Sequence, residues 1–303
     1  MTIRIDIAVC TFRREALSET LASLAGLIVP PDVHLDIIVA DNDVEPSARA
    51  RVEAANTRLA TDVRYVHCPV GNISIARNAC LDNSTADFLA FVDDDETVEP
   101  QWLDRLLAEA EKENADVVLG PVRARYAADA PGWMRRGDFH STRPVWVEGE
   151  IRTGYTCNVL MRLNAPSIAG RRFDLALGRS GGEDTIFFDQ VHAAGGRIAF
   201  AAEAWAEEPV PASRATFAWL ARRRLRMGQT HGRLLAERQE SRIAAASLAA
   251  AKCAACFAGA AALVVLPVPR NRFLLRGLLH AGVVGGLFGA RAIEPYGTLE
   301  AAR

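Results

Sequence analysis

The chain has 303 residues, of which 50% are hydrophobic and 24% are charged, and its formal net charge is −2 at pH 7. This is an ordinary globular balance with ample material for a core. A chain so close to neutral is not a polyelectrolyte, so we expect no nucleic-acid partner.

The six cysteines are scattered and form no compact disulfide framework. Such spacing favours a reduced, cytosolic setting with buried thiols. The N-terminal residues read as the start of a strand and not as a signal peptide. We therefore expect a cytoplasmic protein, and its composition describes an enzyme better than a scaffold.

Apolar runs alternate with amphipathic stretches over the first 120 residues. Continuously apolar runs are typical of strands inside a parallel sheet, and apolar residues at a spacing of three to four indicate helices. Alternation of the two implies an α/β fold, a mainly parallel sheet flanked by helices. We predict strands at 3–10, 35–40, 62–67, 88–92 and 116–119, and helices at 15–27, 44–59, 75–83 and 100–114.

The order changes after about residue 120. Residues 126–146 look like a long excursion, and 145–160 suggests one or two extended segments. We predict helices at 183–194 and 215–238 and a short strand at 197–201. Two apolar tracts follow, at 243–266 and 273–290, separated by a turn flanked by prolines.

Three polar clusters begin where predicted strands end, at Thr11–Arg14, Asp41–Asp43 and Asp93–Glu96. In parallel sheets, ligands bind beyond the carboxyl ends of the strands, so these clusters should converge on one edge. Four adjacent acids repel one another, so Asp93–Glu96 is either solvated or neutralised by a cation. An acidic helix start before Pro100, stabilised by the helix dipole, is the alternative to a metal site.

Five short motifs occur in order within 3–233, and together they resemble family 2 glycosyltransferases with the GT-A fold. The closest similarity is to the bacterial branch that builds succinoglycan-like exopolysaccharides. These enzymes invert stereochemistry and use nucleotide-diphosphate sugars. The motifs are Cys10-Thr11-Phe12-Arg13-Arg14, Ile37-Ile38-Val39-Ala40-Asp41-Asn42-Asp43, Ala76-Arg77-Asn78, Asp93-Asp94-Asp95 and Gly182-Glu183-Asp184.

The resemblance implies a donor site that holds a UDP-, dTDP- or GDP-sugar with Mn²⁺ or Mg²⁺. Asp95 would bind the metal with Asp93, and Asp93 or Asp94 would contact ribose or sugar hydroxyls; hard carboxylate oxygens suit both ions. Asp41 would accept N–H groups of the base. The remaining donor-binding candidates are Thr11, Phe12 and Arg13 along the nucleoside, Asp43 beside Asp41, and Arg77 with Asn78 toward the base or diphosphate.

The resemblance also implies that Asp184 is the general base, which removes the acceptor hydroxyl proton as that oxygen attacks the anomeric carbon. Glu183 would orient the acceptor or the base. A capping pair at the start of a helix is the structural alternative for these two acids. His231 is a further candidate metal or phosphate ligand, although a lone histidine more often is not one.

Aromatic residues in the variable region are candidates for stacking on an acceptor sugar, or are ordinary core. They are Trp133, Trp146 and Tyr155, and Asn158 nearby is a candidate to bond a sugar hydroxyl. The arginines of 222–226 either meet a diphosphate or an anionic headgroup, or form a solvated helix face.

The sequence departs from the family at Cys10, where proline is usual, and at Arg13, where asparagine is usual. It also lacks the Q-x-x-R-W motif of processive synthases, which favours an enzyme that adds one sugar per encounter. A sugar-nucleotide nucleotidyltransferase is an alternative, but 9–14 lacks the glycine-rich loop it needs. An inactive membrane-associated sugar-binding or assembly protein is the other.

The C-terminal tracts raise the question of a membrane. The first is long enough to span a bilayer but contains Lys252, which is costly at the bilayer centre. We therefore expect a helical hairpin on the membrane surface or re-entrant, in a peripheral protein on the inner face of the cell membrane. A polyprenyl-linked glycan acceptor would fit that location. The predicted domains are 1–235, with a nucleotide half (1–120) and an acceptor half (121–235), and 236–303, the apolar helical region.

Overall fold

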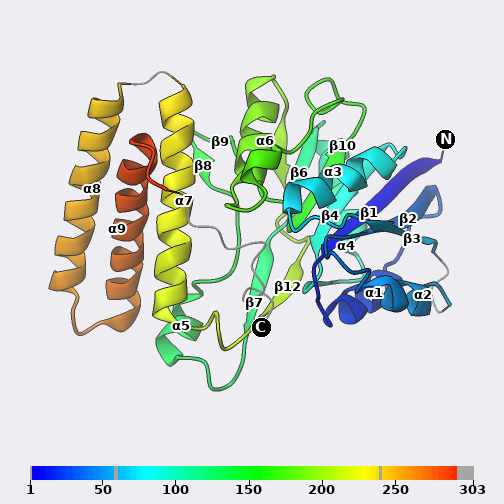
Figure 1. Cartoon of the computed structure of the whole chain (residues 1–303), viewed down its shortest axis with the longest axis horizontal. Coiled ribbons are helices and arrows are strands. Elements are labelled where there is room, and N and C mark those ends of the chain that lie inside the picture. Colours follow the sequence, from blue (N-terminus) through cyan, green and yellow to red (C-terminus); the bar gives the residue numbers. More distant parts are fainter. Residues whose placement is uncertain (1, 58–60, 239–240, 292–303) are drawn as a thin grey trace. The chain divides into compact units, whose positions relative to one another are not determined.

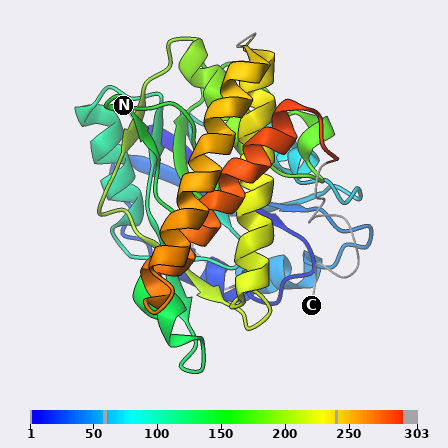
Figure 2. The ribbon, with the colours of Figure 1, turned by 90° about the vertical axis from the view of Figure 1, so that its left-hand side faces the viewer.

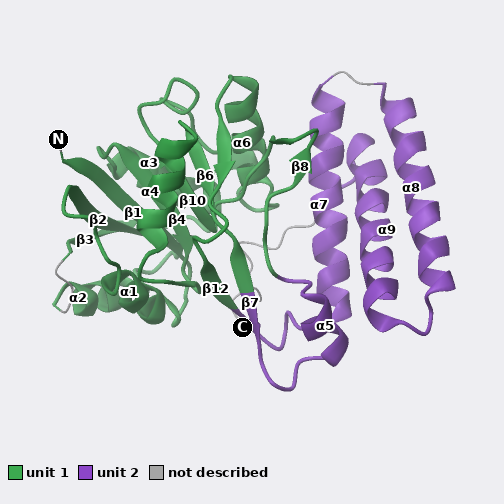
Figure 3. Ribbon diagram, turned by 180° about the vertical axis from the view of Figure 1, so that it is seen from behind, with its two compact units in different colours: residues 1–123, 141–208, 295–303 green, residues 124–140, 209–294 purple. Residues whose placement is uncertain are grey.

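The computed structural model describes residues 2–57, 61–238 and 241–291. Within them the chain forms two compact units, which are described separately and are coloured in Figure 3. The first comprises the described residues up to Arg123 together with Ser141–Glu208. The second comprises Ala124–His140 and the described residues from Pro209 onward.

A seven-stranded sheet is the centre of the first unit in the described part of the chain, with the strand order β11-β6-β10-β4-β1-β2-β3. Its strands are parallel except β10, which lies antiparallel between β4 and β6. The bounds are β1 Ile3–Thr11, β2 Val33–Asp41, β3 Val63–His67, β4 Phe88–Asp93, β6 Val117–Leu119, β10 Asn158–Arg162 and β11 Ile198–Phe200.

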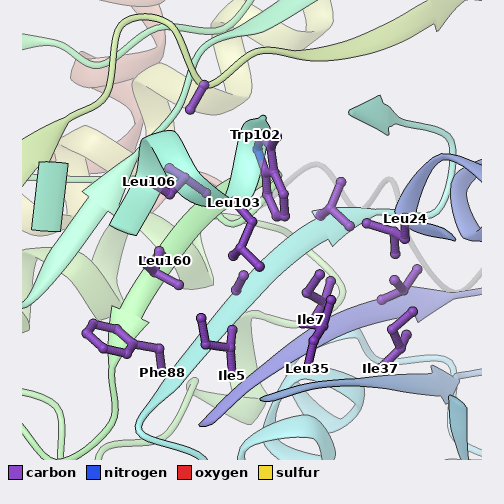
Figure 4. Packing of buried hydrophobic residues seen from close by; sticks show 14 of the residues in the cluster. Ile5, Ile7, Leu24, Leu35, Ile37, Phe88, Trp102, Leu103, Leu106 and Leu160 are labelled. Carbon is purple, nitrogen blue, oxygen red and sulfur yellow. The ribbon is translucent and has the colours of Figure 1, made fainter. Parts of the chain in front are cut away.

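Helices cover both faces of this sheet because both faces of its strands are apolar. Side chains of Ile5, Ile7 and Val9 pack on one face with α1, α2 and α4, and Ala8 packs on the other with α3 and α6. Figure 4 shows the first of these cores, where Trp102 and Leu103 of α4 lie over Ile5 and Ile7. The helix bounds are α1 Leu17–Ala25, α2 Arg49–Asn56, α3 Ile73–Asn83, α4 Trp102–Lys112 and α6 Glu183–Ala193.

Short strands complete the connections. A second sheet has the order β5-β12-β7, and a two-residue hairpin pairs β8 with β9. These strands are β5 Thr97–Val98, β7 Val122–Tyr126, β8 Trp146–Val147, β9 Glu150–Ile151 and β12 Ala206–Val210.

The second unit is helical, with α5 Gly132–Gly137, α7 Phe217–Glu237, α8 Arg242–Ala262 and α9 Pro267–Leu287. Helices α7, α9 and α8 lie side by side in the views of Figures 1 and 2, with α9 in contact with both others. A small core joins the two stretches of chain that build this unit: Met134 and Phe139 pack with Leu220 of α7 and Leu275 of α9.

Glycines set the contact between α7 and α9. A Cβ added to Gly228 would lie 2.0 Å from the carbonyl oxygen of Leu279, and one on Gly282 would lie 2.1 Å from that of Leu225. Gly232 and Gly286 make equally close approaches one turn along each helix. The two backbones therefore touch directly, because small residues four positions apart on each helix leave room for this approach.

The predicted elements of the first unit are present within a few residues of their bounds. Residues 44–48, predicted as the start of a helix, instead form a loop before α2, and Leu59 lies outside the described residues. The antiparallel insertion of β10 was not predicted. In the second unit α9 begins at Pro267, six residues before the predicted tract, since proline is well suited to the first turn of a helix. The predicted boundary at 235 stays a prediction; by contacts, α7 groups with α8 and α9.

Candidate active site

The register of the sheet brings the three polar clusters to one edge. Thr11 is paired with Asp41 across β1 and β2, and Cys10 with Asp93 across β1 and β4. The backbone N–H of Asn42 donates to the carbonyl of Thr11 at 2.8 Å, which ties the first two clusters beyond the ends of their strands. The predicted convergence of these clusters is thus present in the structure.

Two consecutive arginines of the first cluster reach the other two clusters. Arg13 adopts a left-handed backbone conformation (φ 54°), uncommon for a residue with a side chain, and its Nε donates to Asp43 Oδ2 at 2.8 Å. Burial raises the pKa of Asp43, but the bond and charge of Arg13 outweigh it and leave that pKa below its ordinary value. Arg14 lies 3.8 Å from Asp94 Oδ1 and 3.6 Å from Asp95 Oδ2.

Asp41 is fully buried, and the structure uses its carboxylate to shape the adjacent loop. Oδ1 accepts from the backbone N–H of Asp43 at 3.1 Å, while Oδ2 accepts from the N–H of Ala48 and from the hydroxyl of Tyr65, both at 2.8 Å. Three donors thus tie this carboxylate to the loop after β2 and to β3. Contact between Asp41 and a nucleotide base stays a prediction.

The acidic turn after β4 combines burial with like charges. Burial, then the charge of Asp95, raises the pKa of Asp94 to about 7. The backbone N–H of Phe12 lies 3.4 Å from Asp94 Oδ2. Glu96 is fully buried, its Oε2 accepts from the N–H of Asp93 at 3.1 Å, and burial and the charge of Asp93 raise its pKa well above the ordinary value. Burial therefore favours the protonated form of Glu96, and its hydrogen bond to Asp93 braces the turn.

The donor chemistry of this turn fits a divalent cation of the Mg²⁺ or Mn²⁺ type. Such ions are commonly held by one or two carboxylates and by phosphate oxygens of the substrate. Among the described residues, no three or more of His, Cys, Asp and Glu are grouped as a metal cage. Asp93 and Asp95 would hold the ion, and a bound diphosphate would supply other ligands.

Arg77 of α3 and Glu183 of α6 form a buried ion pair, with exposed fractions of 8% and 3%. The guanidinium carbon lies 5.6 Å from the centre of the Phe173 ring. Burial lowers the pKa of Arg77, but the charges of Glu183, then Asp184 and Asp93, outweigh it and leave the pKa raised. Arg77 therefore lies in the combined electrostatic field of the α6 acids and Asp93, the first acid of the acidic turn.

Asp184 lies on the first turn of α6 and is half-buried. The preceding Gly181 and Gly182 have φ values of 77° and 93°, a conformation that glycine adopts without steric cost. Oδ1 of Asp184 accepts from the backbone N–H of Thr185 at 2.6 Å. The sharp entry into α6 thus presents Asp184 at the helix start, as the sequence predicted.

The loop before α6 is held by the N-terminal half of α3. The side-chain amide of Asn78 donates to the Phe173 carbonyl at 2.9 Å and accepts from the Phe173 N–H at 2.8 Å. Ser74 donates to the carbonyl of Asp174 at 2.8 Å, and Asn72 to that of Leu175 at 2.9 Å. Asn78 thus has a structural role here, and its predicted contact with the donor stays a prediction.

Asn158 does not have the role expected of it. It is fully buried, its Oδ1 accepts from the indole of Trp102 at 2.8 Å, and its Nδ2 donates to the carbonyls of Pro121 and Ala204 at 2.9 and 2.8 Å. The amide is consumed by these contacts, so the expected bond to a sugar hydroxyl is wrong.

The other outlying candidates are dispersed. Trp146 is 57% exposed on β8, and the Tyr155 hydroxyl donates to the carbonyl of Gly120 at 2.7 Å. Trp133 belongs to the second unit, where its ring packs against that of Phe139 at 5.1 Å. His231 lies on α7 in the same unit, and its role as a ligand stays a prediction.

Three residues around the site were missed. Arg14 faces the acidic turn, Glu96 braces it, and Tyr65 holds Asp41. Arg14 and Glu96 belong to the polar clusters that follow predicted strands, so the sequence pattern could have indicated a role for both. Tyr65 follows an ordinary strand pattern and carried none.

Comparisons with known proteins show which protein family this chain resembles. Residues 6–167 match the protein family described as Glycosyl transferase family 2. Over 301 residues the chain is 60% identical to the succinoglycan biosynthesis protein ExoM of Rhizobium meliloti (strain 1021), covering 99% of this chain and 97% of that protein.

Two solved structures show the same fold at low sequence identity. The mannosyltransferase PcManGT from Pyrobaculum calidifontis, in complex with GDP-Man and Mn²⁺, is 18% identical with a TM-score of 0.64, over 96% of this chain and 89% of its own. Residues 1–349 of S. aureus TarS, in complex with UDP-GlcNAc, are 16% identical with a TM-score of 0.53, over 92% of each chain. The expected GT-A-type α/β fold is confirmed.

Proposed function

The chain belongs to glycosyl transferase family 2, and from this premise we propose that it transfers one sugar per encounter from a nucleotide-diphosphate sugar to a growing glycan, with inversion at the anomeric carbon. The observation that carries the proposal is that Arg77, which is paired with Glu183 next to Asp184, also lies within the electrostatic field of Asp93 in the acidic turn. A donor diphosphate and a base for the acceptor need these two features close together. Family membership also argues against the nucleotidyltransferase alternative.

The acidic turn is the proposed place of the donor diphosphate. A divalent cation bound by Asp93 and Asp95 would act there as a Lewis acid for the departing nucleotide. Support comes from the carboxylate donors and from a solved structure of the same fold, described as a complex with GDP-Man and Mn²⁺. Thr11, Phe12, Arg13 and Asp94 are proposed to line the donor, which we place among UDP-, dTDP- and GDP-sugars.

Asp184 is the proposed general base. Its carboxylate takes the proton of the acceptor hydroxyl while that oxygen attacks the anomeric carbon from the face opposite the nucleotide. A single in-line displacement of this kind inverts the stereochemistry. Glu183 is the base's neighbour and is held by Arg77, so its proposed part is to fix the start of α6 in place.

The acceptor is proposed to be a glycan in exopolysaccharide synthesis, since the relative of 60% identity is described as a succinoglycan biosynthesis protein. We propose that this glycan is linked to a polyprenyl carrier. The enzyme would then work on the cytoplasmic face of the cell membrane as a peripheral protein.

The test is transfer from radiolabelled UDP-, dTDP- and GDP-sugars to membrane-extracted lipid-linked glycan, with Mn²⁺. Asp184→Asn should lower the rate by at least ~10²-fold, since proton transfer by a positioned base is typically worth that much or more. Asp95→Ala should also lower the rate strongly, since it removes a proposed ligand of the Lewis-acid cation. Asp82→Asn, an exposed acid paired with Arg172, is the matched control and should keep full activity. Far-UV circular dichroism must show all variants folded.

Wild-type rates in Asp184→Asn would remove the base assignment. Absence of transfer with every donor, together with measurable sugar binding, would instead favour an inactive sugar-binding protein.

A further inference from the structure

The turn between α8 and α9 exposes apolar side chains at the end of a helical hairpin. We define Leu263–Leu266 as the hairpin tip; in it Val264, Val265 and Leu266 are 60%, 82% and 51% exposed. Soluble proteins rarely leave adjacent large apolar side chains so open unless they contact a partner. We propose that the hairpin tip and the outer face of α8 dock on an anionic lipid bilayer.

Helix α8 has one packed face and one open face. Ala246, Ala249 and Cys256 are buried within the second unit, while Ile243 and Leu248 on the open face are 76% and 57% exposed. By length and composition α8 is the one helix among the described residues that is apolar enough to cross a membrane, with a mean hydropathy of 1.6, yet only 22% of its most apolar window is buried. The open face therefore offers a continuous apolar surface.

Lying on the bilayer suits α8 better than crossing it. Lys252 is exposed near the middle of the helix, and a span would place its charge at the centre of the hydrocarbon. A helix in the plane of the interface keeps such a charge at the headgroups while its apolar face is buried. The pairing of α8 with α9 leaves only the opposite side of α8 for lipid.

The positive charge of α8 and α9 favours an anionic bilayer over a second copy of the chain as the partner of this surface. The sequence contains no Asp or Glu from Ser241 to Arg291, although the whole chain has a net charge of −2. Two copies of so positive a surface would repel each other, whereas anionic headgroups would attract it. The cationic residues of this stretch are Arg242, Lys252, Arg270, Arg272, Arg276 and Arg291.

Arg270 sits where an interfacial charge is needed. It lies one turn into α9, and its Nη1 donates to the carbonyl of Val264 at 3.2 Å. This bond places a guanidinium directly behind the exposed valines, so that apolar tip and cation reach the interface together. A tip of this kind inserts at the boundary between headgroups and acyl chains.

Docking on a membrane would bring the enzyme to the lipid-linked acceptor of the proposed function. Vesicle binding is nevertheless measured without catalysis. The full chain is sedimented with vesicles of neutral phosphatidylcholine, or of the same lipid with one third phosphatidylglycerol. We expect at least tenfold tighter binding to the anionic vesicles. Val264→Glu/Val265→Glu should reduce that binding at least tenfold, with an unchanged melting temperature.

The matched control is Val145→Glu/Val147→Glu, which places two acids on exposed valines of the first unit (67% and 41% exposed) and should bind as the wild type does. Asp184→Asn should also bind normally, since it changes the proposed base and not the docking surface. Absence of transfer by the wild type, together with intact vesicle binding, would count against the proposed function alone. Equal binding by the tip variant and the wild type, or no binding to either vesicle, overturns the inference. A dimer that the tip variant abolishes, without vesicle binding, would assign the surface to a second copy of the chain.

Discussion

Arg77 and Glu183 form an ion pair that is shielded from water, since only 8% and 3% of their surfaces are exposed. Removing one partner of such a pair leaves an uncompensated buried charge, whereas replacing both with apolar groups is often close to neutral. The pair also joins α3 to α6 directly beside Asp184, so its loss should disturb both stability and the base.

Arg77→Met and Glu183→Met should each lower the free energy of unfolding by about 3–5 kcal/mol, while the double variant should be much closer to the wild type. Urea denaturation of the four proteins measures the coupling. The exposed pair Arg172–Asp82 is the comparison, and Arg172→Met should cost less than about 1 kcal/mol. Additive losses in the double variant of the buried pair would show that the two residues do not act as a unit.

At the residue scale, position was easier to predict than contacts. The places of Asp41 and Asp93 followed from strand ends, and the structure brings both to the predicted edge, while motif order predicted that Asp184 would stand at a helix start. Their partners did not follow, because Asp41 is bonded by Tyr65 and Asn158 by Trp102, residues that only tertiary packing brings near.

Helices α7 and α9 touch through backbone, because the four glycines at their crossing leave no room for a side chain. Gly285, one residue before Gly286, lies off the contact, and a Cβ there would meet only the Ala290 methyl at 3.4 Å. The same helix therefore offers two glycines with opposite requirements.

Gly282→Ala should lower the free energy of unfolding by about 1–3 kcal/mol or more, because the added methyl group forces the helices apart. Gly285→Ala should be neutral or raise it by about 0.5–1 kcal/mol, since alanine favours helix. Thermal unfolding of the two variants checks both signs. Equal effects would mean that the crossing is looser than the structure shows.

Among the elements, those with a clear apolar period were predicted and those that depend on pairing were not. β10 is an apolar run like its neighbours, and nothing in its local sequence fixes its direction. It lies antiparallel between β4 and β6. The long connection that precedes it allows this direction. β5 and β12 are short strands that pair only with distant segments, so no local pattern marks them.

Some buried acids of the folded protein retain a proton at pH values at which the same groups of the unfolded chain would release it. Burial raises the pKa values of Asp6, Asp94 and Glu96, to about 7 for Asp94 and well above the ordinary value for Glu96. The stability from each is fully present below the unfolded pKa near 4 and is lost as the pH rises through the folded pKa. Burial lowers the pKa of His140 to about 4, so this residue changes the pH dependence of stability only below about pH 6.5.

The metal-free protein should therefore lose stability as the pH rises from 6.5 to 8, with a slope of about 1.4 kcal/mol per pH unit for each proton that the folded state retains. Urea titrations in EDTA at several pH values measure this slope. Glu96→Gln keeps the shape of a neutral acid and should flatten the slope, while Glu148→Gln, at an exposed hairpin position, should not. A slope that Glu96→Gln leaves unchanged would mean that Glu96 is ionised in the native state.

The second unit is built from two separate lengths of chain, and this limits how the enzyme can be divided. Met134 and Phe139 find their packing partners on Leu220 and Leu275, more than eighty residues further along. A fragment that stops before α7 would leave these apolar side chains without cover. A minimal soluble catalytic piece must therefore omit or redesign 124–140 as well as the C-terminal helices.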